Sequence, residues 1–288
     1  MTETIAGELR DVSDTALWVA MYRAIESERP DALFRDPFAR RLAGERGPRI
    51  LDAIPHAKTM GWPMVVRTAV FDELLLGLVR AGAVDTVVDL AAGLDARPWR
   101  LDLPATLRWV DVDLPAMLAY KQAGLAGAAP RCRYQARAAD LSDAIARRAL
   151  LAELAADARH AVVLTEGLLI YLDPAEVAAL ARDLAMHAAF EAWILDLATP
   201  ALVRRMDKTW GRAVARGRAP FRFAPAEGTA FFAGAGWRER EWRSTWEEAR
   251  RLNRRMRAAW MFDALAALSP PRARERWRRF SGIALLGR

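Results

Sequence analysis

The chain has 288 residues, of which 53% are hydrophobic and 27% charged, a composition typical of a globular protein with a sizeable core. The net charge is +7, and the excess lies in residues 201–288, which hold 21 basic and 8 acidic residues. A solvated basic surface accounts for this pattern better than a nucleic-acid interface does, so we expect no nucleic-acid partner.

No run of about 18 uninterrupted apolar residues occurs, and acidic residues stand in the first eleven positions where a signal peptide would be basic and then apolar. We therefore expect a cytoplasmic protein that does not engage a membrane. The single cysteine, Cys132, excludes an internal disulfide and is expected to be an ordinary buried residue rather than an activated thiolate. His56, His160 and His187 lie at no ligand-like spacing, so no metal is expected.

The first 80 residues are predicted to be helical, with an apolar face at helical spacing over 63–79. From residue 84 the pattern alternates between strand and helix, which indicates an α/β fold with a parallel sheet flanked by helices. The expected strands are 84–90, 107–112, 133–138, 161–165 and 191–197, and the expected helices are 97–102, 114–124, 141–155 and 174–189.

Residues 199–232 interrupt this alternation and are expected to form a lid together with the N-terminal helices. A late strand follows at 237–242. Ser244 and the acids after it predict a capped helix that continues to Trp260, and a short strand is expected at 283–286. The resulting domain prediction is a helical cap over 1–80 and an α/β domain over 81–288 that carries the lid.

The segment 87–100 carries the strongest functional signal. A buried strand ends at Asp89 and runs into a turn of small residues, in which Ala91 and Gly93 let the backbone approach a ligand. Neither a dinucleotide fingerprint nor a Walker loop is present. Acids take the place of phosphate-binding groups, and carboxylates suit a ligand with ribose hydroxyls, an ammonium and a sulfonium, as in S-adenosylmethionine.

Four motifs follow one another along the chain. They are Asp-Leu-Ala-Ala-Gly-Leu-Asp-Ala-Arg at 89–97, Val-Asp-Val-Asp-Leu-Pro at 110–115, Ala-Asp-Leu at 139–141 and Thr-Glu-Gly-Leu-Leu-Ile-Tyr-Leu at 165–172. With the leader from Thr15 to Pro37, they resemble the leucine carboxyl methyltransferase family, including its bacterial and polyketide-tailoring members. The resemblance covers about residues 12–245 and implies a class I, Rossmann-like methyltransferase with a mostly parallel seven-stranded sheet, helices on both faces and S-adenosyl-L-methionine as cofactor.

Several residues receive cofactor roles from this resemblance. Asp113, or its neighbour Asp111, would accept from the ribose hydroxyls, with Asp113 favoured and a helix-capping acid as the alternative. Asp140 and Leu141 would hold adenine, unless Asp140 caps the next helix.

The methionine part of the cofactor is expected between two further side chains. Glu166 follows a buried strand and would face the sulfonium, because a buried carboxylate needs a cationic partner. Arg67 would bind the methionine carboxylate, and a solvated helix face is the alternative.

The acceptor pocket is expected to include Trp18, Arg23, Trp62 and Trp210, which fall in the proposed lid. No general base is identified, because methyl transfer to a carboxylate needs little beyond proximity, and Tyr22 and Tyr171 are weak candidates only.

The predicted function is S-adenosylmethionine-dependent O-methylation of a carboxylate or hydroxyl on a small molecule in secondary metabolism, that is, natural product biosynthesis. Alternatives are C- or N-methylation of an aromatic, indole-like acceptor, an RNA-binding or RNA-modifying protein, and a module that binds the cofactor without transferring its methyl group.

Overall fold

The computed structural model describes residues 12–54, 56–57, 59–216, 220–256, 259–261 and 268–288, and at 12–13 and 210–216 it describes the backbone alone. The strands are β1 Thr86–Leu90, β2 Arg108–Asp113, β3 Arg133–Ala138, β4 Ala161–Thr165, β5 Phe190–Ala198, β6 Arg238–Ser244 and β7 Ser281–Gly287. The helices are α1 Val12–Ser27, α2 Ala39–Ala43, α3 Arg46–Ala53, α4 Trp62–Arg80, α5 Arg97–Arg100, α6 Pro115–Gly124, α7 Ala144–Ala156, α8 Pro174–Ala185, α9 Pro200–Arg216, α10 Thr245–Arg251 and α12 Pro271–Arg278. The described residues also form two 3-10 helices, η1 Leu169–Tyr171 and η2 Gly228–Ala235.

One seven-stranded sheet has the order β3-β2-β1-β4-β5-β7-β6. The first five strands in this order are parallel, whereas β7 runs antiparallel between β5 and β6. Every residue of β1 and β4 is buried, as expected for central parallel strands rich in valine. The predicted mostly parallel seven-stranded α/β fold is confirmed.

Helices cover both faces of the sheet. α7, α8 and η2 bury leucine, valine and phenylalanine side chains against one face. α4 and α10 pack against the other face, where Phe71 and Leu75 of α4 are fully buried with Trp109 of β2. Although the sequence assigned α4 to the cap, this helix packs on the sheet and only its first turns reach the sheet's carboxyl edge.

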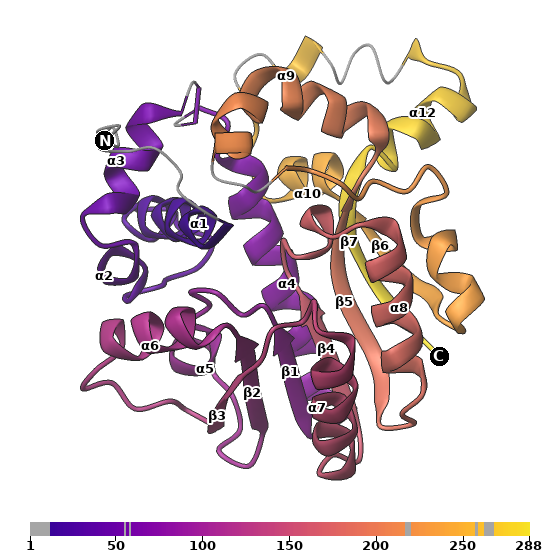
Figure 1. Ribbon diagram of the computed structural model, residues 1–288. Coiled ribbons are helices and arrows are strands. Elements are labelled where there is room, and N and C mark those ends of the chain that lie inside the picture. The colour runs from indigo at the N-terminus through magenta and orange to yellow at the C-terminus, as the bar shows by residue number, and fades with distance from the viewer. Residues whose placement is uncertain (1–11, 55, 58, 217–219, 257–258, 262–267) are drawn as a thin grey trace.

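A third apolar cluster joins α1, α2 and α3 to the loop after β1 and to α6. Figure 1 shows these helices above the carboxyl ends of β1 and β2, with α9 above β5. The two predicted lid segments therefore lie over the same edge of the sheet.

The C-terminal third departs from the prediction at two helices: α12 was not expected, and α10 is shorter than the helix predicted after Ser244. Ser244 is the N-cap residue of α10, but its side chain makes no capping bond, and Glu247, three residues on, pairs with Arg278 instead. α10 ends at Arg251, and Asn253 adopts a positive φ of 52° that breaks the helix expected to reach Trp260. Among the residues described, none of the helices combines the length and apolar character needed to cross a membrane.

Candidate functional site

A cavity of about 650 Å³ lies at the carboxyl edge of the sheet, a volume within the range of small-molecule sites. Its walls come from α1, the first turns of α4, the ends of β1, β2, β4 and β5, and α9. The predicted residues that line it are Trp18, Tyr22, Arg23, Trp62, Arg67, Asp89, Ala91, Gly93, Asp113, Asp140, Leu141, Glu166 and Tyr171. Residues far apart in the sequence thus meet at one site.

The turn after β1 has the left-handed backbone expected of a ligand-binding turn. Ala91 has φ 55° and Gly93 has φ 49°. A left-handed conformation is uncommon for alanine, and such conformations gather where the chain approaches a ligand. The amide of Gly93 donates to Asp113 Oδ2 at 2.7 Å, which joins this turn to the end of β2.

Asp89 lies beneath that turn and is almost fully buried. Its Oδ2 has no hydrogen-bond partner among the described residues. Burial raises the pKa of Asp89 well above its usual value, and the negative charges of Asp95 and Asp111 raise it further. Asp89 is therefore held toward its protonated form, in which it can donate a hydrogen bond.

At the end of β2, the two candidate ribose acids have different environments. Asp113 lines the cavity and accepts from the amides of Gly93 and Leu114, while Leu114 is the N-cap residue of α6. Burial raises the pKa of Asp113. The expectation for Asp111 is wrong: this residue is fully buried outside the cavity lining, where Lys121 Nζ lies 2.5 Å from Oδ2. Tyr134 also donates to Asp111 Oδ2, so the carboxylate of Asp111 is satisfied by partners within the core.

Asp140 and Leu141 line the cavity after β3. Asp140 Oδ1 accepts from the amide and hydroxyl of Ser142, and the hydroxyl bond lowers the pKa of Asp140. The N-cap of α7 is Asp143, whose carboxylate accepts from Ile145 and Ala146. Asp140 is therefore not the capping residue, and only one of its two oxygens is bound to Ser142.

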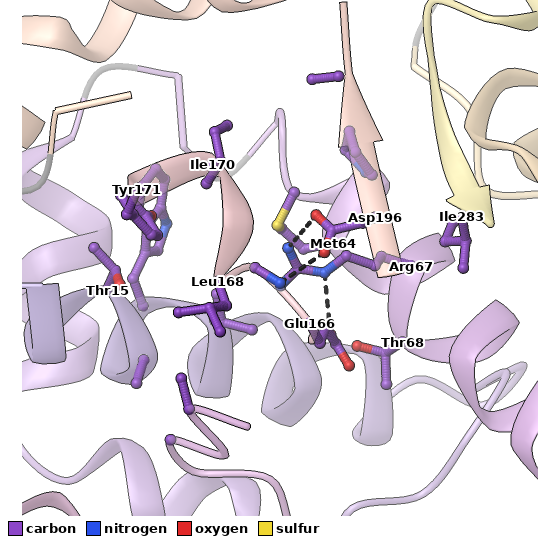
Figure 2. Close-up of a pocket in the computed structure, with 18 of the residues that line it drawn as sticks. Thr15, Met64, Arg67, Thr68, Glu166, Leu168, Ile170, Tyr171, Asp196 and Ile283 are labelled. Carbon is purple, nitrogen blue, oxygen red and sulfur yellow. Dashed lines mark hydrogen bonds and ion pairs between the residues drawn. The ribbon is translucent and has the colours of Figure 1, made fainter. Parts of the chain in front are cut away.

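A cluster of alternating charges forms the floor of the cavity (Figure 2). Arg67 Nε lies 3.0 Å from Glu166 Oε1, and Arg67 Nη1 lies 3.3 Å from Asp196 Oδ2. Asp196 Oδ1 also accepts from the amide of Gly167 at 2.7 Å. Arg67 of α4 thus pairs with one carboxylate at the end of β4 and another at the end of β5.

The cluster continues through Arg97, which is almost fully buried and pairs with Glu166, Asp95 and Asp72. Asp72 also pairs with Arg100. Four carboxylates therefore face three guanidinium groups, an excess of one negative charge in the cluster, although Asp72 itself lies outside the cavity lining. An excess of this sign complements a cationic ligand.

These contacts change how Glu166 and Arg67 are interpreted. Glu166 already has two cationic partners. It is therefore not an unpaired buried carboxylate that needs a cationic ligand for charge balance. Burial alone would raise the pKa of Glu166, but the charges of Arg97 and Arg67 lower it. Arg67 likewise is not on a solvated helix face, because Glu166 and Asp196 hold its guanidinium at the cavity.

The leader helix α1 is tied to the turn after β1. Arg23 donates to Asp36 Oδ2 at 2.9 Å and to the carbonyl of Leu94 at 2.6 Å. Tyr22 donates to the carbonyl of Ala57 and accepts from Trp18 Nε1, and burial raises the pKa of its phenol. These residues hold the cover in place, and Tyr22 is poorly suited to act as a base.

The part of the cavity toward β7 is mainly apolar. Trp62 meets the ring of Trp246 edge-on at 6.3 Å, and its Nε1 is buried without a hydrogen-bond partner among the described residues. On the opposite side of the cavity, beside Thr15 of α1 (Figure 2), Tyr171 packs beside Phe221 at 5.9 Å, and burial raises the pKa of its phenol. Other apolar residues that line the cavity are Met64, Leu202, Met206, Phe223 and Ile283. Trp210 lies on α9, where the side chain is outside the described structure.

Asp196 is the main site residue that the sequence analysis missed. It lies near the carboxyl end of a buried strand, as Asp89, Asp113 and Glu166 do, so the same signal was available. The four family motifs end before β5, so the resemblance assigns no role to Asp196.

Two other predictions concern residues outside the cavity. Cys132 is buried, and burial raises the pKa of its thiol to about 11, which agrees with an ordinary core cysteine. Within the described ranges, no group of three or more histidine, cysteine, aspartate or glutamate side chains is arranged to hold a metal ion.

The strand order, with β7 antiparallel between β5 and β6, defines the class I methyltransferase fold. A crystal structure of a DUF574 family protein from Streptomyces avermitilis matches with a TM-score of 0.59 at 14% identity, covering 94% of this chain and 96% of the other. A "putative methyltransferase" from Thermobifida fusca matches with a TM-score of 0.52 at 17% identity, covering 93% and 94%. At these identities the likeness concerns the fold.

Sequence relatives place the chain within this class. A Parafrankia sp. protein is 40% identical over 186 residues, which cover 60% of this chain and 58% of that relative. A Streptomyces avermitilis protein is 35% identical over 238 residues, 77% of this chain and 82% of the relative. Both are named "putative S-adenosyl-L-methionine-dependent methyltransferase". The model of the leucine carboxyl methyltransferase family matches residues 16–185, and the chain belongs to that family.

Proposed function

We propose that the chain is an S-adenosylmethionine-dependent methyltransferase that methylates an oxygen of a small, largely apolar acceptor. The observation that carries this proposal is the cavity itself, which has acidic side chains at the ends of β1, β2, β4 and β5 and an apolar wall toward β7. The names of the relatives support the activity, and the resemblance supports the cofactor.

The residues present fit the cofactor. Asp113 has lone pairs left for two ribose hydroxyls after accepting from Gly93 and Leu114, because a carboxylate offers about four acceptor sites. Asp140 and Leu141 would hold adenine, and Arg67 would reach the methionine carboxylate. Buried polar atoms without partners among the described residues, on Asp89, Thr68 and Trp62, line the same cavity.

When bound, S-adenosylmethionine supplies an activated methyl group on a positively charged sulfur. The chain would hold the two reactants close together in a cavity covered by α1 and α9, which excludes water. Such positioning contributes on the order of 7 to 11 kcal/mol to the reaction. The excess negative charge of the cluster formed by Arg67, Arg97, Arg100 and their carboxylates would favour the cationic reactant.

Calorimetry with S-adenosylmethionine and S-adenosylhomocysteine tests the proposal. We expect saturable binding of one molecule of either per chain. Absence of binding by both would contradict the assigned cofactor, and binding without turnover on any acceptor would favour a module that does not transfer the methyl group.

A second function, C- or N-methylation of an aromatic acceptor, is favoured by Trp62 and Trp246, whose rings line the acceptor side. The products separate the possibilities. Mild base hydrolyses a methyl ester, whereas a methyl ether and an N- or C-methyl product survive.

A further inference from the structure

Asp196 has the position of a residue that acts on the acceptor. It ends β5, lines the cavity, and keeps about a quarter of its side chain exposed. The amide of Gly167 and the guanidinium of Arg67 fix its two oxygens. The carboxylate is therefore held in one orientation at the cavity surface (Figure 2).

The strand order determines where Asp196 lies along the carboxyl edge of the sheet. Asp140, Asp113, Asp89, Glu166 and Asp196 lie at or just past the carboxyl ends of β3, β2, β1, β4 and β5, in the order of neighbouring strands. If the nucleoside lies at Asp140 and Asp113, its methionine part lies near Glu166. Asp196 is one strand further along, toward β7 and the apolar wall.

This side of the cavity is poorly suited to a negatively charged acceptor. Arg67, the cation beside Asp196, is already paired with Glu166 and Asp196, and its remaining donors would be taken by the methionine carboxylate of the cofactor. The neighbouring side chains Met64 and Ile283 are apolar, and Arg205 of α9 is exposed rather than buried against them. A carboxylate brought next to Asp196 would meet a like charge in a partly desolvated site.

We propose that Asp196 is the proton acceptor for a neutral hydroxyl group on an apolar acceptor, so that the chain forms methyl ethers rather than methyl esters. This inference rests on the function proposed above. The hydroxyl proton passes to Asp196 as the oxygen forms its bond to the methyl carbon. The methyl-sulfur bond breaks, its electron pair stays on sulfur, and Asp196 later releases the proton to water.

Two probes that share one aromatic ring system and differ in charge test the inference by binding. Calorimetry on protein saturated with S-adenosylhomocysteine would compare 1-naphthol, which is neutral at pH 7, with 1-naphthoate. We expect 1-naphthol to bind at least about tenfold more tightly, because the like charge of Asp196 opposes the carboxylate. Binding of naphthoate as tight as that of naphthol, or binding of neither probe, would overturn the inference.

Three variants separate charge from structure. Asp196→Asn keeps an oxygen for the amide of Gly167 and removes the charge, so we expect naphthoate to gain affinity and naphthol to keep its own. Asp196→Glu keeps the charge and should keep the preference for naphthol. Asp102→Asn, an exposed acid outside the cavity lining, is the matched control and should change neither probe.

Turnover of 1-naphthol supplies an independent readout. Asp196→Asn should lower kcat by roughly 100- to 10,000-fold with little change in KM, the usual contribution of a positioned proton acceptor. An unchanged kcat would overturn the inference. If the unmodified protein binds S-adenosylhomocysteine, the proposed methyltransferase activity still stands in that case. If the unmodified protein does not bind it, both the proposed function and the role of Asp196 are contradicted.

Discussion

Single carboxylates in this site have separate tasks that follow from their surroundings. Asp111 and Asp113 are two residues apart on one strand, yet the first neutralises Lys121 in the core and the second faces the cavity. Asp89 lies close to both in a pocket without a hydrogen-bond donor for its Oδ2 among the described residues. Burial and partners, rather than residue type, assign these roles.

Asp113→Asn tests the ribose contact. We expect S-adenosylhomocysteine to bind roughly 10- to 150-fold more weakly, because hydrogen bonds to a charged acceptor contribute about 1.5 to 3 kcal/mol. Calorimetry measures the loss, with Asp102→Asn as the control. Equal affinity in both variants would remove Asp113 from the cofactor site.

Asp89→Asn should stabilise the protein in a pH-dependent way. The pKa of Asp89 is raised in the folded state, so the folded protein keeps this proton to a higher pH than the unfolded chain does. As the pH rises above about 4, ionisation of Asp89 in the unfolded chain favours unfolding, and the free energy of unfolding falls. The amide cannot ionise, so the variant should gain stability over the unmodified protein toward neutral pH and gain none near pH 4. Urea unfolding at several pH values measures this difference, and a gain that is independent of pH would contradict it.

At the scale of elements, the loop after β4 depends on a glycine. Gly167 has φ 70°, and a Cβ at this position would lie 3.0 Å from Arg67 Nη1. The loop can therefore pass close to the guanidinium while its amide donates to Asp196. This arrangement ties the ends of β4 and β5 to α4.

Gly167→Ala should destabilise the protein by about 1 to 3 kcal/mol, because the left-handed backbone and the close contact with Arg67 both disfavour a side chain. Gly77→Ala is the matched control. Gly77 lies within α4 with no atom near the added Cβ, so we expect this change to stabilise by roughly 0.5 to 1 kcal/mol. Chemical unfolding of both variants measures the contrast, and equal effects would contradict it.

The strands were predictable because they are short, buried and rich in valine, and the acids that line the cavity were predictable because they lie at the carboxyl ends of those strands. The helix expected to reach Trp260 was not, because the turn at Asn253 depends on distant partners. Arg254, next to this turn, is held by Glu26 of α1, and local helix propensity carries no information about that contact. The partners of Arg67 could not be predicted for the same reason, because they are distant from it in the sequence.

At the scale of the whole molecule, many arginines of the basic C-terminal third are engaged in ion pairs. Arg243 and Arg251 bind Glu73 and Glu248, and Arg279 binds Glu239. Arg254 is nearly buried and pairs with Glu26 and Asp31, which joins this region to the N-terminal cover. These contacts favour a structural role over a surface for RNA.

Arg254→Ala should destabilise the protein by about 3 to 5 kcal/mol, because it removes the hydrogen-bonded cationic partner of the buried Glu26 and leaves only the half-exposed Arg29 at 3.7 Å. Arg159→Ala, which removes an exposed partner of Asp85, should have little effect. Thermal unfolding with S-adenosylhomocysteine absent and present measures both changes. A small effect of Arg254→Ala would contradict the proposed link between the two regions.

The antiparallel β7 has a consequence for how the molecule is made. Residues 281–287 fill the gap between β5 and β6, and Gly282 and Ile283 complete the wall of the cavity. A ribosome that has synthesised β5 must still produce more than 80 residues before that edge is covered. Until then the nascent chain exposes an unpaired strand edge, a surface prone to self-association. Bound cofactor can therefore stabilise the finished protein, but it cannot protect the nascent chain from self-association.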